Sequence, residues 1–264
     1  MPASNLLQEL ENVVRAAGDL ARVTRKGAFR HWTKGKDRSP VSEADIAVND
    51  LLRERLTKLV PGAGWLSEET EDDPAARAGS RVWIVDPIDG TRAFISGRPD
   101  WTVSVALVEH GRPVAAALYA PVTDEMFLGT AGSGARLNGV PLAVSQGADL
   151  TGAKVAGPKR YLEKLERLTP AILPQPKVHS LALRLTRVGA GTLDVAFSSG
   201  GSHDWDLAAA DLLVHEAGGL MTDFAGRPLS FNRPHLVHGA LVAAGPARHG
   251  ALLQLVRDRM PELA

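Results

Sequence analysis

The chain has 264 residues, with 30 lysines and arginines against 30 aspartates and glutamates, so its formal net charge at pH 7 is zero. That balance lacks the basic excess of a protein that binds nucleic acid mainly through its phosphates, so we expect a local site to meet its partner. Hydrophobic residues make up 44% and charged residues 23% of the chain, which excludes disordered and collagen-like proteins.

Cysteine is absent, which excludes disulfides, thiolate metal sites and cysteine nucleophiles. Any bound metal must therefore use oxygen or imidazole ligands. The first residues contain no apolar signal region, and no apolar run reaches the ~20 residues of a membrane span. We expect a cytoplasmic protein that binds neither a membrane nor a nucleic acid polymer.

Two amphipathic helices are predicted first. Apolar residues recur at spacings of three and four from Leu6 to Ala21, which places them on one face of an opening helix. After a polar stretch, Ser42 is a suitable N-cap for a second helix, which the pair Pro61-Gly62 ends.

Short β-rich runs follow from Trp65 onward and predict a sheet with antiparallel neighbours. The pairs His110-Gly111 and Asn138-Gly139 are predicted to form tight turns. The predicted strands are residues 82–85, 101–108, 114–119 and 125–128.

After about residue 150, strands and helices alternate, a pattern typical of α/β layers. The predicted strands are residues 154–156, 194–197, 220–222 and 240–243, and the predicted helices are residues 160–168, 181–186, 206–217 and a last one that ends near 260. Because no linker or repeat interrupts the chain, we expect one unit over 1–264, with an α+β lobe over about 1–150 and an α/β lobe over 151–264.

The most informative stretch is residues 83–91, WIVDPIDGT. A buried apolar strand ends there in Asp86 and Asp89, and Gly90 lets the backbone approach a ligand. Carboxylates are the ligands that Mg²⁺ prefers, and the N–H groups of a short helical segment over 92–96 would face an anion such as phosphate. An Asp-Gly pair alone is usually a surface turn, but the full string predicts adjoining metal and phosphate sites.

This string resembles the signature of the inositol monophosphatase superfamily of Mg²⁺-dependent phosphatases. Three other segments resemble family motifs and occur in the family's order. Glu68 matches the first glutamate of a Gly-Glu-Glu segment, and Asp206 matches the aspartate of Trp-Asp-x-Ala-Ala. The stretch from Lys36 to Asp45 resembles Lys-x-Asp-x-Ser-Pro-Val-Thr-x-x-Asp. Each motif alone has a simpler explanation, such as a helix cap, so their combination supports the resemblance.

The resemblance implies two bound Mg²⁺ ions and leaves a third open. Glu68, Asp86 and the main-chain carbonyl of Ile88 would hold the first ion. Asp86, Asp89 and Asp206 would hold the second, so that Asp86 bridges the pair. Such ions clamp the phosphate and lower the pKa of a bound water. The expected nucleophile is therefore water.

The resemblance also implies catalytic roles for Glu68, Thr91 and Asp45. Thr91, hydrogen-bonded to Glu68 or Asp45, would orient the attacking water, while the amides of Gly90 and Thr91 would hold a phosphate oxygen. Asp45 either only caps its helix or also lies near the third metal, and both readings stay open. The candidate substrate-binding residues are Asp89, Gly90, Thr91, Asp206, Lys36 and Arg184.

The substrate is less determined than the reaction, because metal ligands are shared across the superfamily. Its members hydrolyse inositol monophosphates, 3′(2′),5′-bisphosphonucleotides, histidinol phosphate or fructose 1,6-bisphosphate. In the inositol enzymes a glutamate just before the Trp-Asp motif contacts the substrate, but residues 197–202 contain no acid here. Residues 180–184 resemble the nucleotidase segment, whereas residues 201–203 resemble the inositol branch.

We therefore expect adenosine 3′,5′-bisphosphate as the substrate and keep inositol 1-phosphate as the alternative, with histidinol phosphate and fructose 1,6-bisphosphate behind them. Lys159, Arg160 and Arg184 are candidates for contact with a second phosphate, or they form only a solvated basic face. His203 is expected to be structural or to lie at the rim of the site. The non-enzyme alternative is a phosphatase homologue that has lost catalysis and only binds a phosphorylated metabolite.

The resemblance further implies a layered α-β-α-β-α sandwich of the sugar-phosphatase type, with an N-terminal antiparallel sheet and a C-terminal α/β region. It also implies a homodimer and inhibition by Li⁺.

Overall fold

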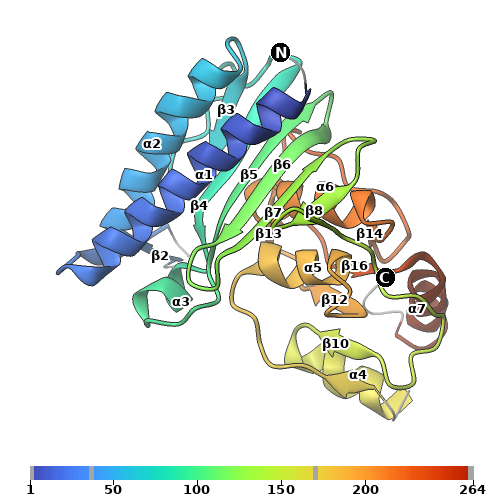
Figure 1. The fold of residues 1–264 in the computed structure, drawn as a ribbon. Coiled ribbons are helices and arrows are strands. Elements are labelled where there is room, and N and C mark those ends of the chain that lie inside the picture. The colour runs from blue at the N-terminus through green and yellow to red at the C-terminus, as the bar shows by residue number, and fades with distance from the viewer. Residues whose placement is uncertain (1–2, 36–38, 169–171, 261–264) are drawn as a thin grey trace.

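The computed structural model describes residues 3–35, 39–168 and 172–260. Its elements form five layers in the order helices, sheet, helices, sheet, helices (Figure 1). The layered α-β-α-β-α sandwich expected from the sequence is therefore confirmed. Three groups of buried apolar side chains fill the spaces between successive layers. No helix in these described ranges is both long enough and apolar enough to span a bilayer.

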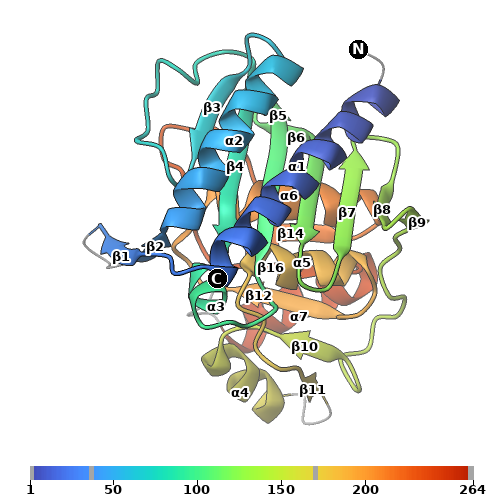
Figure 2. The ribbon, with the colours of Figure 1, turned by 60° about the vertical axis from the view of Figure 1, so that its left-hand side comes forward.

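The first layer consists of α1 (Ala3–Lys26) and α2 (Glu43–Leu59), which lie across one face of the larger sheet (Figure 2). As predicted, α2 begins directly after Ser42, which forms a capping box with Asp45. The opening helix is longer than predicted, because polar residues continue it beyond its apolar stripe. In the chain, the two helices are joined by a hairpin of β1 (His31–Lys34) and β2 (Ser39–Ser42), which was not predicted from this polar stretch of the sequence.

The second layer is a seven-stranded sheet whose order follows the chain. Every neighbouring pair is antiparallel except β3 and β4, which are parallel. The expectation of antiparallel neighbours is therefore confirmed for the four predicted strands, and the parallel edge strand β3 was not predicted. His110 and Asn138 have positive φ angles in the turns predicted for them. The strands are β3 (Gly64–Ser67), β4 (Arg81–Asp89), β5 (Thr102–Glu109), β6 (Arg112–Ala120), β7 (Glu125–Thr130), β8 (Ala135–Leu137) and β9 (Val140–Pro141).

The middle layer consists of α5 (Leu181–Gly189) and α6 (Asp204–Glu216), which pack between the two sheets. The fourth layer is a five-stranded sheet in the order β11-β10-β12-β16-β14, with parallel pairs on one side and antiparallel pairs on the other. Its strands are β10 (Lys154–Ala156), β11 (Leu173–Pro174), β12 (Val195–Ser198), β14 (Leu220–Asp223) and β16 (Leu241–Ala244).

The outer layer consists of α4 (Lys159–Leu168) and α7 (Pro246–Arg259), whose apolar sides cover the smaller sheet. A short helix, α3 (Thr91–Ile95), follows β4, and a two-stranded ribbon pairs β13 (Ser202–His203) with β15 (Val237–His238). The N-terminal end of the middle layer faces the carboxyl end of β4. That junction is where the acidic motifs of the sequence meet.

Candidate active site

The carboxyl end of β4 brings two aspartates to the same side of the sheet. In a regular strand, residues three apart point to opposite faces. Here the pairing shifts, because Asp86 lies opposite Ser104 whereas Asp89 lies opposite Thr102, so three steps on β4 match two on β5. Such a bulge redirects a side chain, and both carboxylates are buried. The Ile88 amide donates to Asp86 Oδ1 at 3.0 Å and holds that carboxylate in place.

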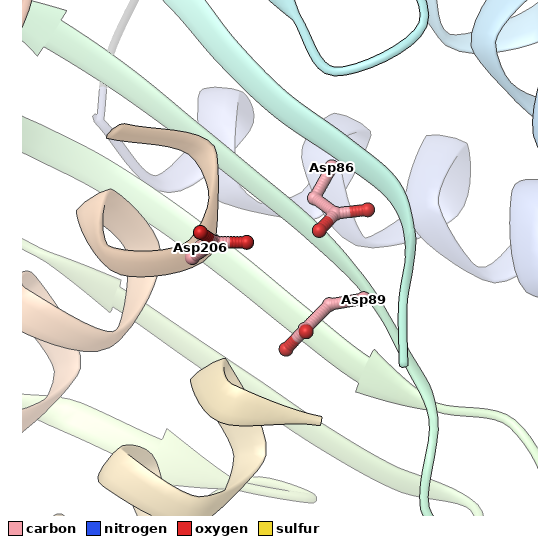
Figure 3. Close-up of side chains that lie close together, drawn as sticks. All are labelled: Asp86, Asp89 and Asp206. Atoms are coloured by element: carbon pink, nitrogen blue, oxygen red, sulfur yellow. The ribbon is translucent and has the colours of Figure 1, made fainter. Parts of the chain in front are cut away.

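Asp206 joins them from the first turn of α6. One carboxylate oxygen each from Asp86, Asp89 and Asp206 lie within 4.8 Å of one another (Figure 3). The main-chain amide of His203, the N-cap residue of α6, donates to Asp206 Oδ2 at 2.6 Å. Three carboxylates at this separation repel one another, and hard oxygen donors of this kind fit Mg²⁺.

Asp89 is also bound to the start of α5. Its carboxylate accepts hydrogen bonds from the Ser180 hydroxyl at 2.6 Å and from the amides of Ala182 at 2.7 Å and Leu181 at 3.2 Å. The next residue, Gly90, has φ of 95°, and a Cβ there would lie 3.2 Å from the Ser180 amide nitrogen. Glycine is required at this position because the backbone is left-handed and α5 approaches so closely.

Glu68 lies just beyond β3 and lines the same pocket as the three aspartates. The Lys34 ammonium lies 3.4 Å from Glu68 Oε1, donates to the Glu68 carbonyl oxygen at 3.0 Å, and also pairs with Glu69. Lys34 therefore neutralises part of the acidic cluster. The sequence did not single it out, because it comes from the unpredicted β1–β2 hairpin.

Thr91 lies beside Asp45, one of the two acids expected near it. Its hydroxyl oxygen is 3.1 Å from Asp45 Oδ1 and 3.0 Å from the carbonyl oxygen of Ile88, so one proton can serve either acceptor. Asp45 Oδ2 accepts from both the amide and the hydroxyl of Ser42, at 2.8 and 2.6 Å. Asp45 thus caps α2 and contacts Thr91 at the same time.

Burial dominates the electrostatics of the cluster. It raises the pKa of Glu68 from its ordinary value of 4.5 to about 7, although the nearby Lys34 lowers it. Burial is also the main cause that raises the pKa of Asp45 and Asp89. It raises the pKa of Asp86 and Asp206 further, and repulsion from the neighbouring carboxylates adds to the rise at these two. A bound cation would relieve this cost, which supports a metal centre at these residues.

The carboxylates line an open cavity of about 280 Å³, here called the acidic pocket. Arg92, Lys177 and His179 line it as well. The sequence placed Arg92 at the start of the segment expected to face an anion, but it did not single out Lys177 or His179. Glu68 and Asp206 also border a second recess of about 430 Å³, whose lining includes Lys34, His203 and Trp205. The rings of His203 and Trp205 stack 4.5 Å apart, so His203 is a rim residue of that recess.

The structure does not bring every candidate basic residue to this pocket. Arg184 lies on α5, where burial lowers the pKa of its guanidinium although the charge of Asp89 raises it, and it does not line the acidic pocket. Lys159 and Arg160 lie on α4, and Arg160 borders a separate surface hollow. Neither of these two lines the acidic pocket, and their contact with a second phosphate stays a prediction beside the alternative of a solvated basic face. Lys36 lies outside the described residues.

The comparisons with known proteins agree with this site. The model of the "Inositol monophosphatase family" matches residues 3–260. The chain is 37% identical over 232 residues to an inositol-1-monophosphatase from Rhizobium meliloti, and 31% identical over 230 residues to a fructose-1,6-bisphosphatase/inositol-1-monophosphatase from Thermotoga maritima. Each alignment covers 84% of both chains.

Among solved structures, the extragenic suppressor protein suhB from Bartonella henselae aligns with a TM-score of 0.85 and 28% identity, over 97% of this chain and 99% of that one. Fold, site geometry and sequence agree across nearly the whole chain. The chain therefore belongs to the inositol monophosphatase family, whose members are metal-dependent phosphatases.

Proposed function

We propose that this chain hydrolyses a phosphomonoester of a small metabolite at the acidic pocket, with Mg²⁺ held by Glu68, Asp86, Asp89, Asp206 and the carbonyl of Ile88. The observation that supports this most is the approach of three carboxylates to within 4.8 Å in an open cavity. When bound there, Mg²⁺ would neutralise phosphate charge and lower the pKa of a water.

Other residues of the chain supply orientation and proton positioning. In this proposal the Thr91 hydroxyl accepts a hydrogen bond from the attacking water, and its contacts with Asp45 and the Ile88 carbonyl support that role. Asp45 accepts a hydrogen bond from the Thr91 hydroxyl and is itself held by Ser42. Lys34 keeps Glu68 and Glu69 together and limits their repulsion.

We propose adenosine 3′,5′-bisphosphate as the preferred substrate. The missing acid in residues 197–202 argues against close contact with an inositol hydroxyl, and Arg92 and Lys177 add positive charge to the pocket. Inositol 1-phosphate is the second candidate, because the relative from Rhizobium meliloti carries the name of that activity. A homodimer, inhibition by Li⁺ and a cytoplasmic location remain predictions.

A phosphate-release assay tests this function. With Mg²⁺ we expect turnover of adenosine 3′,5′-bisphosphate above inositol 1-phosphate, fructose 1,6-bisphosphate and histidinol phosphate, and none of them should react in EDTA. Asp89→Asn and Asp206→Asn should each lower kcat/KM by at least about 10²-fold. Asp19→Asn, which changes an exposed carboxylate on α1, is the control. Wild-type activity in either site variant would show that the site is wrong.

A further inference from the structure

Two cations that line the acidic pocket have no partner among the described residues. Arg92 and Lys177 both line it, and both are exposed. Across residues 3–35, 39–168 and 172–260, neither side chain forms an ion pair or hydrogen bond. Other basic groups around the site differ in this respect, because Lys34 pairs with Glu68 and Glu69, and His179 contacts Asp100 at 2.6 Å.

The backbone that carries Lys177 is fixed on both sides. Before it, the Gln175 amide donates to the Val155 carbonyl at 2.8 Å, next to a proline on either side. After it, the His179 amide donates to Asp100 Oδ2 at 2.8 Å, and the Ser180 amide donates to the Asp100 carbonyl at 3.1 Å. The fixed backbone holds Lys177 at the pocket, so binding of a ligand has to order only its side chain.

Lys177 also connects the acidic pocket to a second cavity. That cavity, here called the side recess, has a volume of about 350 Å³, and Arg98 and Arg187 also line it. Acids offset these two arginines, since Arg98 pairs with Asp100 and Arg187 with Glu125. Lys177 is therefore the uncompensated charge where the two cavities adjoin. With the side recess included, the space reaches the range of about 300–1,000 Å³ that small ligands occupy.

We propose that Lys177 and Arg92 form a subsite for a second phosphate of the substrate, away from the phosphate that is hydrolysed. This proposal rests on the proposed function, because it assumes that the carboxylates hold metal and the first phosphate. The planar guanidinium of Arg92 offers paired N–H donors to phosphate oxygens, and the Lys177 ammonium adds a point charge. No bond forms or breaks at this subsite. It selects bisphosphates over monophosphates.

The test compares adenosine 3′,5′-bisphosphate with adenosine 3′-monophosphate, which differ only in the second phosphate. The readout is the ratio of their kcat/KM values at fixed Mg²⁺ and ionic strength. We expect the wild-type ratio to lie well above one. Lys177→Gln and Arg92→Gln should each lower it by about tenfold, mainly through the KM of the bisphosphate, as for loss of one charge-assisted hydrogen bond. Lys177→Glu should lower it further, and Lys177→Arg should restore most of it.

Lys159→Gln is the matched control, because it removes an exposed lysine charge on α4, and it should keep the wild-type ratio. Circular dichroism and thermal midpoints check that each variant is folded. A wild-type ratio near one, a ratio that Lys177→Gln does not lower, or an equal loss in Lys159→Gln would overturn the subsite. If neither ester releases phosphate with Mg²⁺, the proposed function itself fails.

Discussion

Thr91 and Asp45 form the contact whose loss should be most specific for the chemical step. Thr91→Ala removes the hydroxyl that lies 3.1 Å from Asp45, and leaves the metal carboxylates in place. We expect kcat to fall by about 10²–10⁴-fold with little change in KM, because positioning of a proton in the transition state is lost. Steady-state kinetics measures this. Thr91→Ser, which keeps the hydroxyl, should retain most of the activity, and an active Thr91→Ala enzyme would remove the proposed role.

At the scale of single residues, the sequence predicted those that belong to contiguous motifs. Asp86, Asp89 and Asp206 could be chosen because each stands in a short string with a recognisable pattern, and the structure brings them together. Lys34 and Lys177 stand in no such string. Their position depends on a hairpin and on an irregular segment, which no local periodicity describes.

Among the elements, α5 has the most direct link to the site. Ser180 caps this helix by accepting from the Leu183 amide at 2.9 Å, and its hydroxyl donates to Asp89. Ser180→Ala should therefore lower the free energy of unfolding by about 1 kcal/mol and also weaken Mg²⁺-dependent activity. Chemical denaturation and a Mg²⁺ titration of the rate measure the two effects.

Thr57→Ala is the control for this variant, because it removes an exposed hydroxyl of α2 that bonds only within its own helix. It should leave the Mg²⁺ dependence as in the wild type. If Ser180→Ala lowers stability but leaves that dependence unchanged, the serine acts only as a helix cap and not as a support for Asp89.

At this scale the regular elements were predictable and their interruptions were not. The strong periodicities of α2, β5 and β6 placed those elements within a few residues of their observed bounds. The bulge between Asp86 and Asp89 was not foreseen, because it depends on the pairing of β4 with β5 and not on β4 alone. The helix α6 begins two residues before its predicted start at residue 206, because its N-cap is His203.

For the whole molecule, the buried carboxylates predict how stability without metal depends on pH. Burial raises the pKa of Glu68 to about 7 in the folded chain, against 4.5 ordinarily. The folded protein therefore binds more protons than the unfolded chain between these values. The contribution of Glu68 to stability is therefore largest below about pH 4.5 and is lost as the pH rises through 7, by about 3 kcal/mol.

Mg²⁺ should reverse that loss, because it binds the deprotonated carboxylates of the folded state. We expect saturating Mg²⁺ to raise Tm more at pH 8 than at pH 5, as measured by differential scanning calorimetry. Asp206→Asn should reduce the difference between the two pH values. An equal rise in Tm at both would contradict the acidic cluster as the metal centre.

The resemblance to the inositol monophosphatase superfamily predicted the order of the layers, whereas the periodicity of apolar residues did not. Alternating patterns indicated an antiparallel sheet, but they could not reveal that α6 packs against the larger sheet, far from it in the chain. Long-range packing of this kind depends on how whole faces fit together. For the same reason, the sequence did not predict that Lys177 and His179 line the acidic pocket.

The amides that hold the acidic side chains have a consequence for how this chain can change over descent. For Asp45, Asp86, Asp89 and Asp206, at least one donor is a main-chain N–H, and the donors are the amides of Ser42, Ile88, Leu181, Ala182 and His203. Because every amino acid except proline carries that group, the side chains at these donor positions can be exchanged without losing the bond. The geometry of the site can thus be conserved while the surrounding sequence diverges, in keeping with the 28% identity and the TM-score of 0.85 to the suhB protein from Bartonella henselae.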